Sequence, residues 1–333
     1  MFLRKKNTAV GFAGCPFDMK KQLIHQLISL LILVSLSYFA NGQSSVAITI
    51  DDVPNTSNYQ MGSFKSILLN KLDSLKIPIT IFINGGNVFR NDSVEKNFSL
   101  LNQWIKRDYI TLGNHTYSHS RYSSVGIDSF KIDVGKGENN LHELALKHRK
   151  SLKYFRFPYN DLGKDSIQHQ DMEKYLSSRN YTIAPYTVES SDWMISYIYN
   201  YYLEKKDTLK ANEIAESYIL KTIEYFDFFD SLALKIYGRR IKQVYLCHDN
   251  ILNGNYLPKL INELKKKRYT FISLDEALQD DVYKQEDKYY KPWGVSWLYR
   301  WMNTREEITS FQKHEPKDDL YDLYLQLSNQ NKK

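Results

Sequence analysis

The chain has 333 residues, a formal net charge of +7 and two cysteines. Its 42% of hydrophobic and 25% of charged residues exclude a disordered chain, and its 14 glycines and 8 prolines exclude a collagen-like repeat. Two cysteines cannot build a disulfide-scaffolded fold. The length fits one large domain or two small ones, and the positive charge raises the question of a nucleic-acid partner.

Residues 1–42 have the pattern of a secretory signal peptide. Two lysines precede an apolar run over residues 27–40, and small residues follow at Ala40 and Gly42. The run is shorter than the roughly 20 residues that span a bilayer. We therefore expect a mature chain that starts near Gln43, is secreted or periplasmic, and has no stable membrane span. The alternative is an uncleaved leader that anchors the protein in the membrane.

Removal of this leader weakens the argument for a nucleic-acid partner. The leader holds five basic side chains and one acidic side chain, so the remaining chain has 40 basic and 37 acidic groups. The sequence also lacks an arginine-rich run, zinc-finger spacing and a basic helix. We therefore expect no nucleic-acid partner.

After the leader, short apolar runs rich in β-branched residues alternate with amphipathic stretches. The runs predict strands at 46–50, 78–83, 109–112, 154–157, 182–188, 244–247 and 270–273. This alternation predicts an α/β fold of βαβ units with parallel strands. Seven units fit a (β/α) barrel close to TIM-barrel size, with an open doubly wound sheet as the alternative. The glycine fingerprint of dinucleotide-binding sheets is absent after the first run.

Residues 43–280 are expected to form this barrel domain. Within it, the Tyr-rich residues 194–240 have helical patterning and predict an insertion between the fifth and sixth strands. Residues 281–333 are expected to form an aromatic-rich, helical C-terminal extension that packs on the domain. Three tryptophans in it are spaced by four residues and are expected on one helical face: Trp293, Trp297 and Trp301.

Polar side chains follow five of the predicted strands at the point where each strand ends. They are Asp51, Asp52, His115, His119, Arg156, Asp192, Trp193 and His248. Each pattern alone is common in proteins. Because the carboxyl ends of barrel strands meet on one rim, we expect these side chains to converge there.

The converging residue types fit a metal-assisted hydrolase. Two histidines four residues apart, with one carboxylate, make a ligand set that suits zinc or a similar divalent ion. Asp51 and Asp52 point to opposite sides of an extended strand, so we expect one to bind the metal and the other to accept a proton from water. Arg156 would keep that second carboxylate ionised. His248 can protonate a leaving group, and Asp192 can fix its tautomer.

In this order, the residues resemble the five motifs of the polysaccharide deacetylase family, carbohydrate esterase family 4, which shares the nodulation-factor deacetylase domain. The motifs are ITIDDVP at 48–54, HTYSH at 115–119, RFPY at 156–159, DW at 192–193 and VYLCH at 244–248. The resemblance covers residues 45–280. It implies a distorted (β/α)7 barrel and a bound divalent metal, usually zinc, with Co²⁺, Ni²⁺ or Mn²⁺ as alternatives.

The resemblance also implies a role for each motif residue. The metal ligands would be Asp52, His115 and His119. Asp51 would be the general base, oriented by Arg156. His248 would be the general acid, tuned by Asp192.

The remaining motif residues would contact the substrate. The backbone N–H of Tyr159 would help to bind the oxyanion, next to Pro158. Trp193 and Leu246 would line the pocket for the acetyl methyl group. Asn160 stands where the family has glycine, and asparagine tolerates the left-handed backbone that such a turn requires.

From these residues we expect a secreted, metal-dependent deacetylase that hydrolyses N-acetyl groups, or O-acetyl groups, of an acetylated polysaccharide or oligosaccharide. One alternative is a different hydrolase of non-peptide C–N bonds on the same barrel. Another is a non-catalytic glycan-binding protein, suggested by the 14% of aromatic residues.

Overall fold

The computed structural model describes residue 26 and residues 43–59, 65–317 and 319–330. The predicted signal peptide and its cleavage site, within residues 1–42, lie outside the described residues apart from residue 26. Among the described helices, none combines the length and the apolar character needed to cross a membrane.

The core of the domain is a parallel sheet in the order β5-β4-β3-β2-β1-β7-β6, with β8 paired to the start of β1. Its strands are β1 (Ser45–Val53), β2 (Ile79–Ile83), β3 (Ile110–Asn114), β4 (Leu152–Phe155), β5 (Thr182–Ile183), β6 (Val188–Glu189), β7 (Lys242–His248) and β8 (Thr270–Phe271). The central strands are buried on both faces, which explains their continuous apolar runs.

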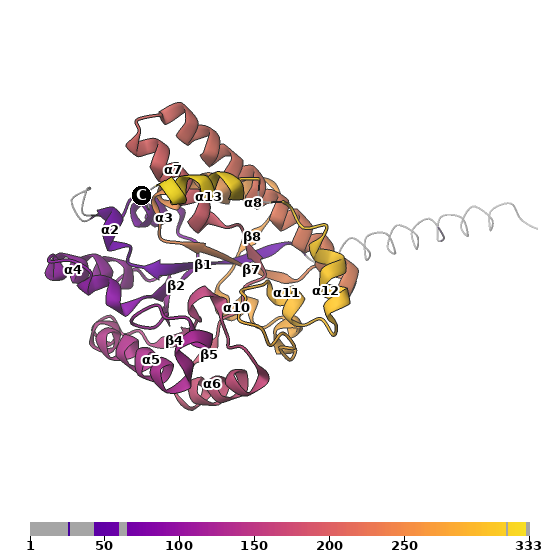
Figure 1. Cartoon of the computed structure of the whole chain (residues 1–333), viewed down its shortest axis with the longest axis horizontal. Helices are drawn as coiled ribbons and strands as arrows, with labels where there is room; N and C mark the ends of the chain where they lie inside the picture. Colours follow the sequence, from indigo (N-terminus) through magenta and orange to yellow (C-terminus); the bar gives the residue numbers. More distant parts are fainter. Residues whose placement is uncertain (1–25, 27–42, 60–64, 318, 331–333) are drawn as a thin grey trace, which may run out of the picture. The chain divides into compact units, whose positions relative to one another are not determined.

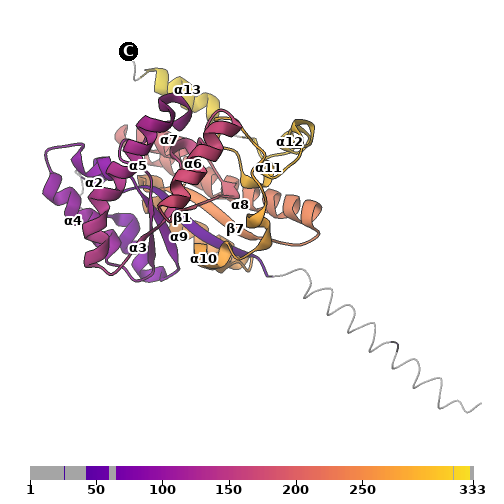
Figure 2. The same ribbon diagram turned by 90° about the horizontal axis from the view of Figure 1, so that it is seen from below.

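Helices cover the sheet, with α5 and α6 on one side of the strands and α7, α8 and α13 on the opposite side (Figure 1). Turned by 90°, β1 and β7 run side by side through the middle of the domain (Figure 2). The helices are α2 (Thr56–Tyr59), α3 (Ile67–Leu75), η2 (Gly85–Phe89), α4 (Val94–Ile105), α5 (Tyr122–Lys147), η3 (Pro158–Asn160), α6 (Ser166–Ser178), α7 (Asp192–Glu204), α8 (Thr208–Tyr237), α9 (Ile251–Lys266), α10 (Leu274–Ala277), η4 (Asp281–Lys284), α11 (Trp297–Arg300), α12 (Arg305–Gln312) and α13 (Tyr321–Gln330).

The prediction of a distorted (β/α)7 barrel with helical additions is confirmed, with one difference. The fifth predicted strand, residues 182–188, is two short strands: β5 pairs with β4, and β6 pairs with β7. Pro185 lies between them and has no N–H for a ladder hydrogen bond. Within the described part of the chain β5 and β6 are not paired, so the barrel is open at this segment.

The residues of the predicted insertion are helical, in α7 and α8. In the C-terminal extension Trp297 and Trp301 are buried. The prediction that the three tryptophans lie on one helical face is wrong, because α11 starts only at Trp297 and the Trp293 side chain is 63% exposed. Pro292 and Gly294 flank Trp293, and both residue types disfavour a helix interior.

Candidate active site

The carboxyl end of β1 bulges, and this brings both of its acids to one side. The pairing register of β1 with β2 shifts between Ile50 and Val53, and Asp52 has a left-handed backbone with φ of 63°. As a result a carboxylate oxygen of Asp51 lies 3.9 Å from His115 Nε2, and one of Asp52 lies 3.8 Å from the same atom. The alternation expected of an extended strand is therefore broken at this point.

Asp52, His115 and His119 form a cluster that could hold a metal ion. One ligand atom from each lies within 4.8 Å of the other two, and His119 Nε2 is 3.3 Å from Asp52 Oδ1. The segment that carries the histidines is a tight turn and not a helix. Thr116 and His119 both have left-handed φ angles, and the His119 N–H donates to the Thr116 hydroxyl at 3.1 Å.

The His115 ring is fixed in the tautomer that metal binding requires. Its Nδ1 lies 2.8 Å from the Arg156 carbonyl oxygen, which can only accept, so Nδ1 carries the proton. Nε2 is then an unprotonated nitrogen directed at the carboxylates. Burial lowers the pKa of His115 to about 3, which keeps the ring neutral.

Arg156 is completely buried and holds Asp51 in place. Its Nη1 donates to Asp51 Oδ1 at 3.0 Å and to the Thr49 hydroxyl at 2.7 Å, and its Nη2 donates to the Pro185 carbonyl at 3.0 Å. The guanidinium also lies over the ring of Phe82, 4.2 Å from its centroid. Burial raises the pKa of Asp51, and Arg156 opposes only part of that rise, so this carboxylate is more basic than a free one.

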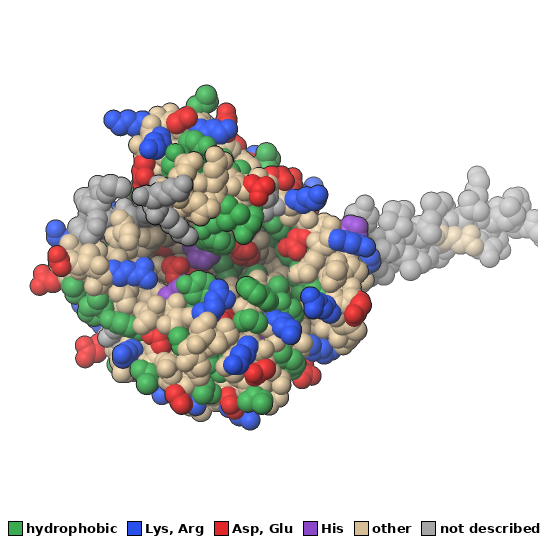
Figure 3. All heavy atoms as spheres, viewed as in Figure 1, with side chains coloured by type: hydrophobic (Ala, Val, Ile, Leu, Met, Phe, Trp, Pro, Cys, Tyr) green, Lys and Arg blue, Asp and Glu red, His purple; other side chains and the backbone are tan. Residues whose placement is uncertain are grey.

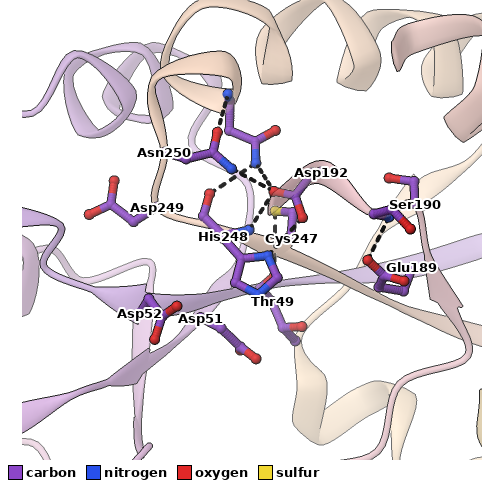
Figure 4. A network of polar contacts seen from close by, with 12 residues as sticks. Thr49, Asp51, Asp52, Glu189, Ser190, Asp192, Cys247, His248, Asp249 and Asn250 are labelled. Atoms are coloured by element: carbon purple, nitrogen blue, oxygen red, sulfur yellow. Dashed lines mark hydrogen bonds and ion pairs between the residues drawn. The ribbon is translucent and has the colours of Figure 1, made fainter. Parts of the chain in front are cut away.

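At the end of the neighbouring strand β7, His248 is paired with Asp192. His248 Nδ1 lies 2.7 Å from Asp192 Oδ1 (Figure 4). The fully buried Asp192 also accepts hydrogen bonds from the His248 N–H and from the side-chain amides of Asn250 and Asn253. Burial alone would lower the pKa of His248, but the charge and hydrogen bond of Asp192 outweigh it and raise that pKa to about 10.

Asp51 and His248 are register partners on the neighbouring strands β1 and β7, and both line a cavity of about 450 Å³. On the face shown in Figure 3, histidine and acidic side chains lie at the bottom of a hollow. Tyr159 and Trp193, both about half exposed, and the buried Leu246 line the cavity. Pro158 is buried and is not among the described lining residues. Asn160 has φ of 50°, the left-handed backbone expected at this position.

The cavity also has lining residues that sequence reasoning missed. Arg121 lies over the Tyr159 ring, 4.3 Å from its centroid, and donates to the Pro292 carbonyl at 3.1 Å. Burial, with help from Asp192, raises the pKa of Glu189 to about 7. Glu189 directly follows the fifth predicted strand, so its position at a strand end could have marked it. Gly294 comes from the C-terminal extension, and no pattern in the sequence marks it.

Comparisons with known proteins cover part of the chain. Residues 40–176 match the family profile described as polysaccharide deacetylase. A peptidoglycan-N-acetylglucosamine deacetylase of Bacillus cereus is 26% identical over 151 residues, which are 45% of this chain and 47% of that protein. The chain thus spans about half the length of this curated relative.

Two solved structures illustrate the more distant similarities. A CE4-family pseudoenzyme from Bacillus anthracis is 14% identical with a TM-score of 0.48, over 72% of this chain and 66% of that one. A family 4 carbohydrate esterase from Streptomyces lividans is 18% identical with a TM-score of 0.43, over 70% of this chain and 95% of that one.

The profile match contains three of the motifs quoted from the sequence, those around Asp51, His115 and Arg156. The three possible metal ligands, Asp52, His115 and His119, therefore lie inside the matched region. His248 and Asp192 lie beyond it, and the fold brings them to the same cavity. Over residues 40–176 the chain is thus similar to the polysaccharide deacetylase family.

Proposed function

We propose that this protein is a divalent-metal-dependent deacetylase that hydrolyses the N-acetyl groups of a glycan outside the cytoplasm. The single observation that carries the proposal is the presence of a basic carboxylate, Asp51, and a protonated imidazole, His248, in one cavity that also holds three possible metal ligands. A relative named as a peptidoglycan-N-acetylglucosamine deacetylase supports the substrate class.

The donor set fits a divalent ion. One carboxylate and two imidazoles are ligands that zinc prefers, and cobalt, nickel and manganese accept the same set. Asp52, His115 and His119 would hold the ion, and the proton on His115 Nδ1 leaves its Nε2 free to ligate. When bound, such an ion polarises a carbonyl oxygen and lets water attack near neutral pH.

Asp51 accepts the proton of the attacking water in this proposal. Its raised pKa makes it a stronger base, and the hydrogen bond from Arg156 leaves its other oxygen directed at His115. Arg156 therefore sets the position of the base without contacting the substrate.

His248 protonates the departing amine. The Asp192 carboxylate holds Nδ1, so the ring presents Nε2 to the cavity and is protonated at neutral pH. The Tyr159 backbone N–H would stabilise the oxyanion. Trp193 and Leu246 would enclose the acetyl methyl group, and the half-exposed Tyr159 ring would contact the sugar.

The test is acetate release from a panel of acetylated glycans by metal-stripped protein and by protein reloaded with zinc, cobalt, nickel or manganese. Asp51→Asn should retain metal and lose about 10³-fold or more in kcat, because it removes the base and leaves the ligands. His119→Ala should lose both metal and activity. His142→Ala, on the exposed face of α5, is the matched control and should lose neither. Unchanged acetate release by Asp51→Asn would refute the assignment of the base.

The same panel separates the alternatives. O-acetylated xylan and small cyclic amides are included, and turnover of an amide alone would indicate another C–N hydrolase. Tight glycan binding by the metal-loaded protein, with no acetate released from any substrate, would indicate a binding protein.

A further inference from the structure

Asn253, in the first turn of α9, uses every hydrogen-bonding group of its side chain. Its Nδ2 donates to Asp192 Oδ2 at 2.5 Å and to the His248 carbonyl oxygen at 2.9 Å. The His248 carbonyl oxygen and the ionised Asp192 carboxylate can only accept hydrogen bonds. The amide nitrogen of Asn253 must therefore face these two oxygens, which fixes the orientation of the side chain. The opposite end of the amide, Oδ1, therefore needs a donor.

That donor is the hydroxyl of Tyr218, at 2.7 Å. Tyr218 lies in α8, one of the two helices of the stretch that the sequence predicted as an insertion. Its side chain is completely buried, like that of Asn253. Burial raises the pKa of the Tyr218 phenol well above its usual value, so the hydroxyl keeps its proton and can donate.

The directions of the next two hydrogen bonds follow from this. A phenol hydroxyl has one hydrogen, and the Tyr218 hydroxyl donates it to Asn253 Oδ1. The Tyr245 hydroxyl, 3.0 Å away, must therefore donate to Tyr218, and the Ser190 hydroxyl, also at 3.0 Å, must donate to Tyr245. The result is a buried chain in which each donor points toward Asp192. Bonds aligned in this way polarise one another.

We propose that Asn253 and Tyr218 are positioning residues for the general acid: they fix the Asp192 carboxylate, and through it the His248 ring with Nε2 toward the cavity. This assigns α8 a role in the reaction. The proposal rests on the proposed function for the meaning of His248 as an acid. The polar contacts around Asp192 and His248 are drawn in Figure 4.

The experiment uses Asn253→Ala and Tyr218→Phe in the full-length, metal-loaded protein. Tyr256→Phe is the matched control, because Tyr256 in α9 donates to Asn212 in α8 at 2.9 Å and so joins the same two helices at an exposed place. One readout is kcat and KM for acetate release. The other is the solvent exchange of the His248 Nδ1 proton, followed by NMR with ¹⁵N-labelled histidine, which needs no substrate.

We expect Asn253→Ala to lower kcat about 10- to 100-fold and Tyr218→Phe to lower it less, with KM changed less than about twofold in both. The His248 Nδ1 proton should exchange faster in both variants and as in wild type in Tyr256→Phe. Should Asn253→Ala fail to fold, Tyr218→Phe, which removes a single oxygen atom, carries the test.

Unchanged kcat and unchanged exchange in Tyr218→Phe and Asn253→Ala would overturn the proposal. So would an equal loss in Tyr256→Phe, since the effect would then come from helix packing. If the wild-type protein releases no acetate from any glycan, the proposed function fails. The exchange measurement still decides whether this chain of hydrogen bonds fixes His248.

Discussion

A single methyl group added at Gly294 should reach the proposed oxyanion site from the C-terminal extension. A Cβ at this position would lie 2.7 Å from the Tyr159 carbonyl oxygen and 3.0 Å from Asn160 Cβ. An ordinary Cβ contact is 3.4 Å or longer, so the extension and the Tyr159 loop must separate by about 0.7 Å in Gly294→Ala.

The extension cannot take up all of that movement, because it is held on both sides of Gly294. Arg121 donates to the Pro292 carbonyl, the Ser296 hydroxyl donates to the Thr187 carbonyl at 2.7 Å, and the Trp297 N–H donates to the Tyr186 carbonyl at 2.9 Å. Part of the shift must therefore fall on the backbone of Tyr159. Since a misplacement of about 1 Å can cost about 100-fold in rate, we expect kcat to fall about tenfold.

The assay is acetate release by zinc-loaded Gly294→Ala, with metal content and thermal unfolding measured on the same sample. Metal content should be unchanged, because the ligands lie on β1 and after β3. Overpacking of this kind costs about 1–3 kcal/mol of unfolding free energy, so Tm should fall by several degrees. Gly135→Ala in α5 is the control, because its Cβ would meet nothing within 4 Å. A wild-type kcat in Gly294→Ala would refute a link between the extension and the Tyr159 backbone.

Two further predictions concern other walls of the cavity. Tyr324 of α13 lies edge-on to Trp193, with ring centroids 5.6 Å apart, so Tyr324→Ala should raise KM for a glycan about two- to tenfold and leave kcat unchanged. Tyr321→Ala, on the same helix and 50% exposed, is its control, and an equal rise in KM there would contradict the role of the ring contact. The pKa of Glu189 rises from an ordinary 4.5 to about 7 in the folded protein, so between these values the unfolded state alone releases a proton and stability falls as pH rises. Glu189→Gln should remove that slope, so its stability relative to wild type should rise by about 3 kcal/mol between pH 4.5 and pH 7, seen as a growing difference in Tm. A constant difference would contradict the raised pKa.

The sequence predicted which residues meet in the cavity better than it predicted their local geometry. Parallel strands with helical crossovers bring all carboxyl ends to one rim, so Asp51, His115, Arg156 and His248 could be assigned to one site from their places along the chain. The same reasoning treated the end of β1 as extended. It therefore could not foresee that a left-handed backbone at Asp52 turns both acids toward His115.

The contacts that the insertion and the extension make near the cavity could not be predicted from the sequence, for a physical reason. Tyr218 meets Asn253 across 35 positions of the chain, and Gly294 meets Tyr159 across a still longer separation. Contacts of this kind depend on how helices dock, and neither periodicity nor motif spacing encodes that. The tryptophan spacing misled for a related reason: Trp293 follows a proline and precedes a glycine, so local backbone preference outweighed the period of four.

The aromatic excess now argues against a protein that only binds glycans. Most aromatic side chains of α8 and α11 face inward: Tyr218, Phe226, Phe229, Trp297 and Tyr299 are almost completely buried. They join the insertion and the extension to the barrel, and their faces are not available to a sugar. Of the exposed aromatic residues in the described part of the chain, Tyr159 and Trp193 line the cavity. The Tyr159 ring lies edge-on to His119 of the metal-ligand cluster, and Trp193 directly follows Asp192 in the chain. The rings available to a glycan in this cavity therefore lie where an acetyl group would react, as a deacetylase requires.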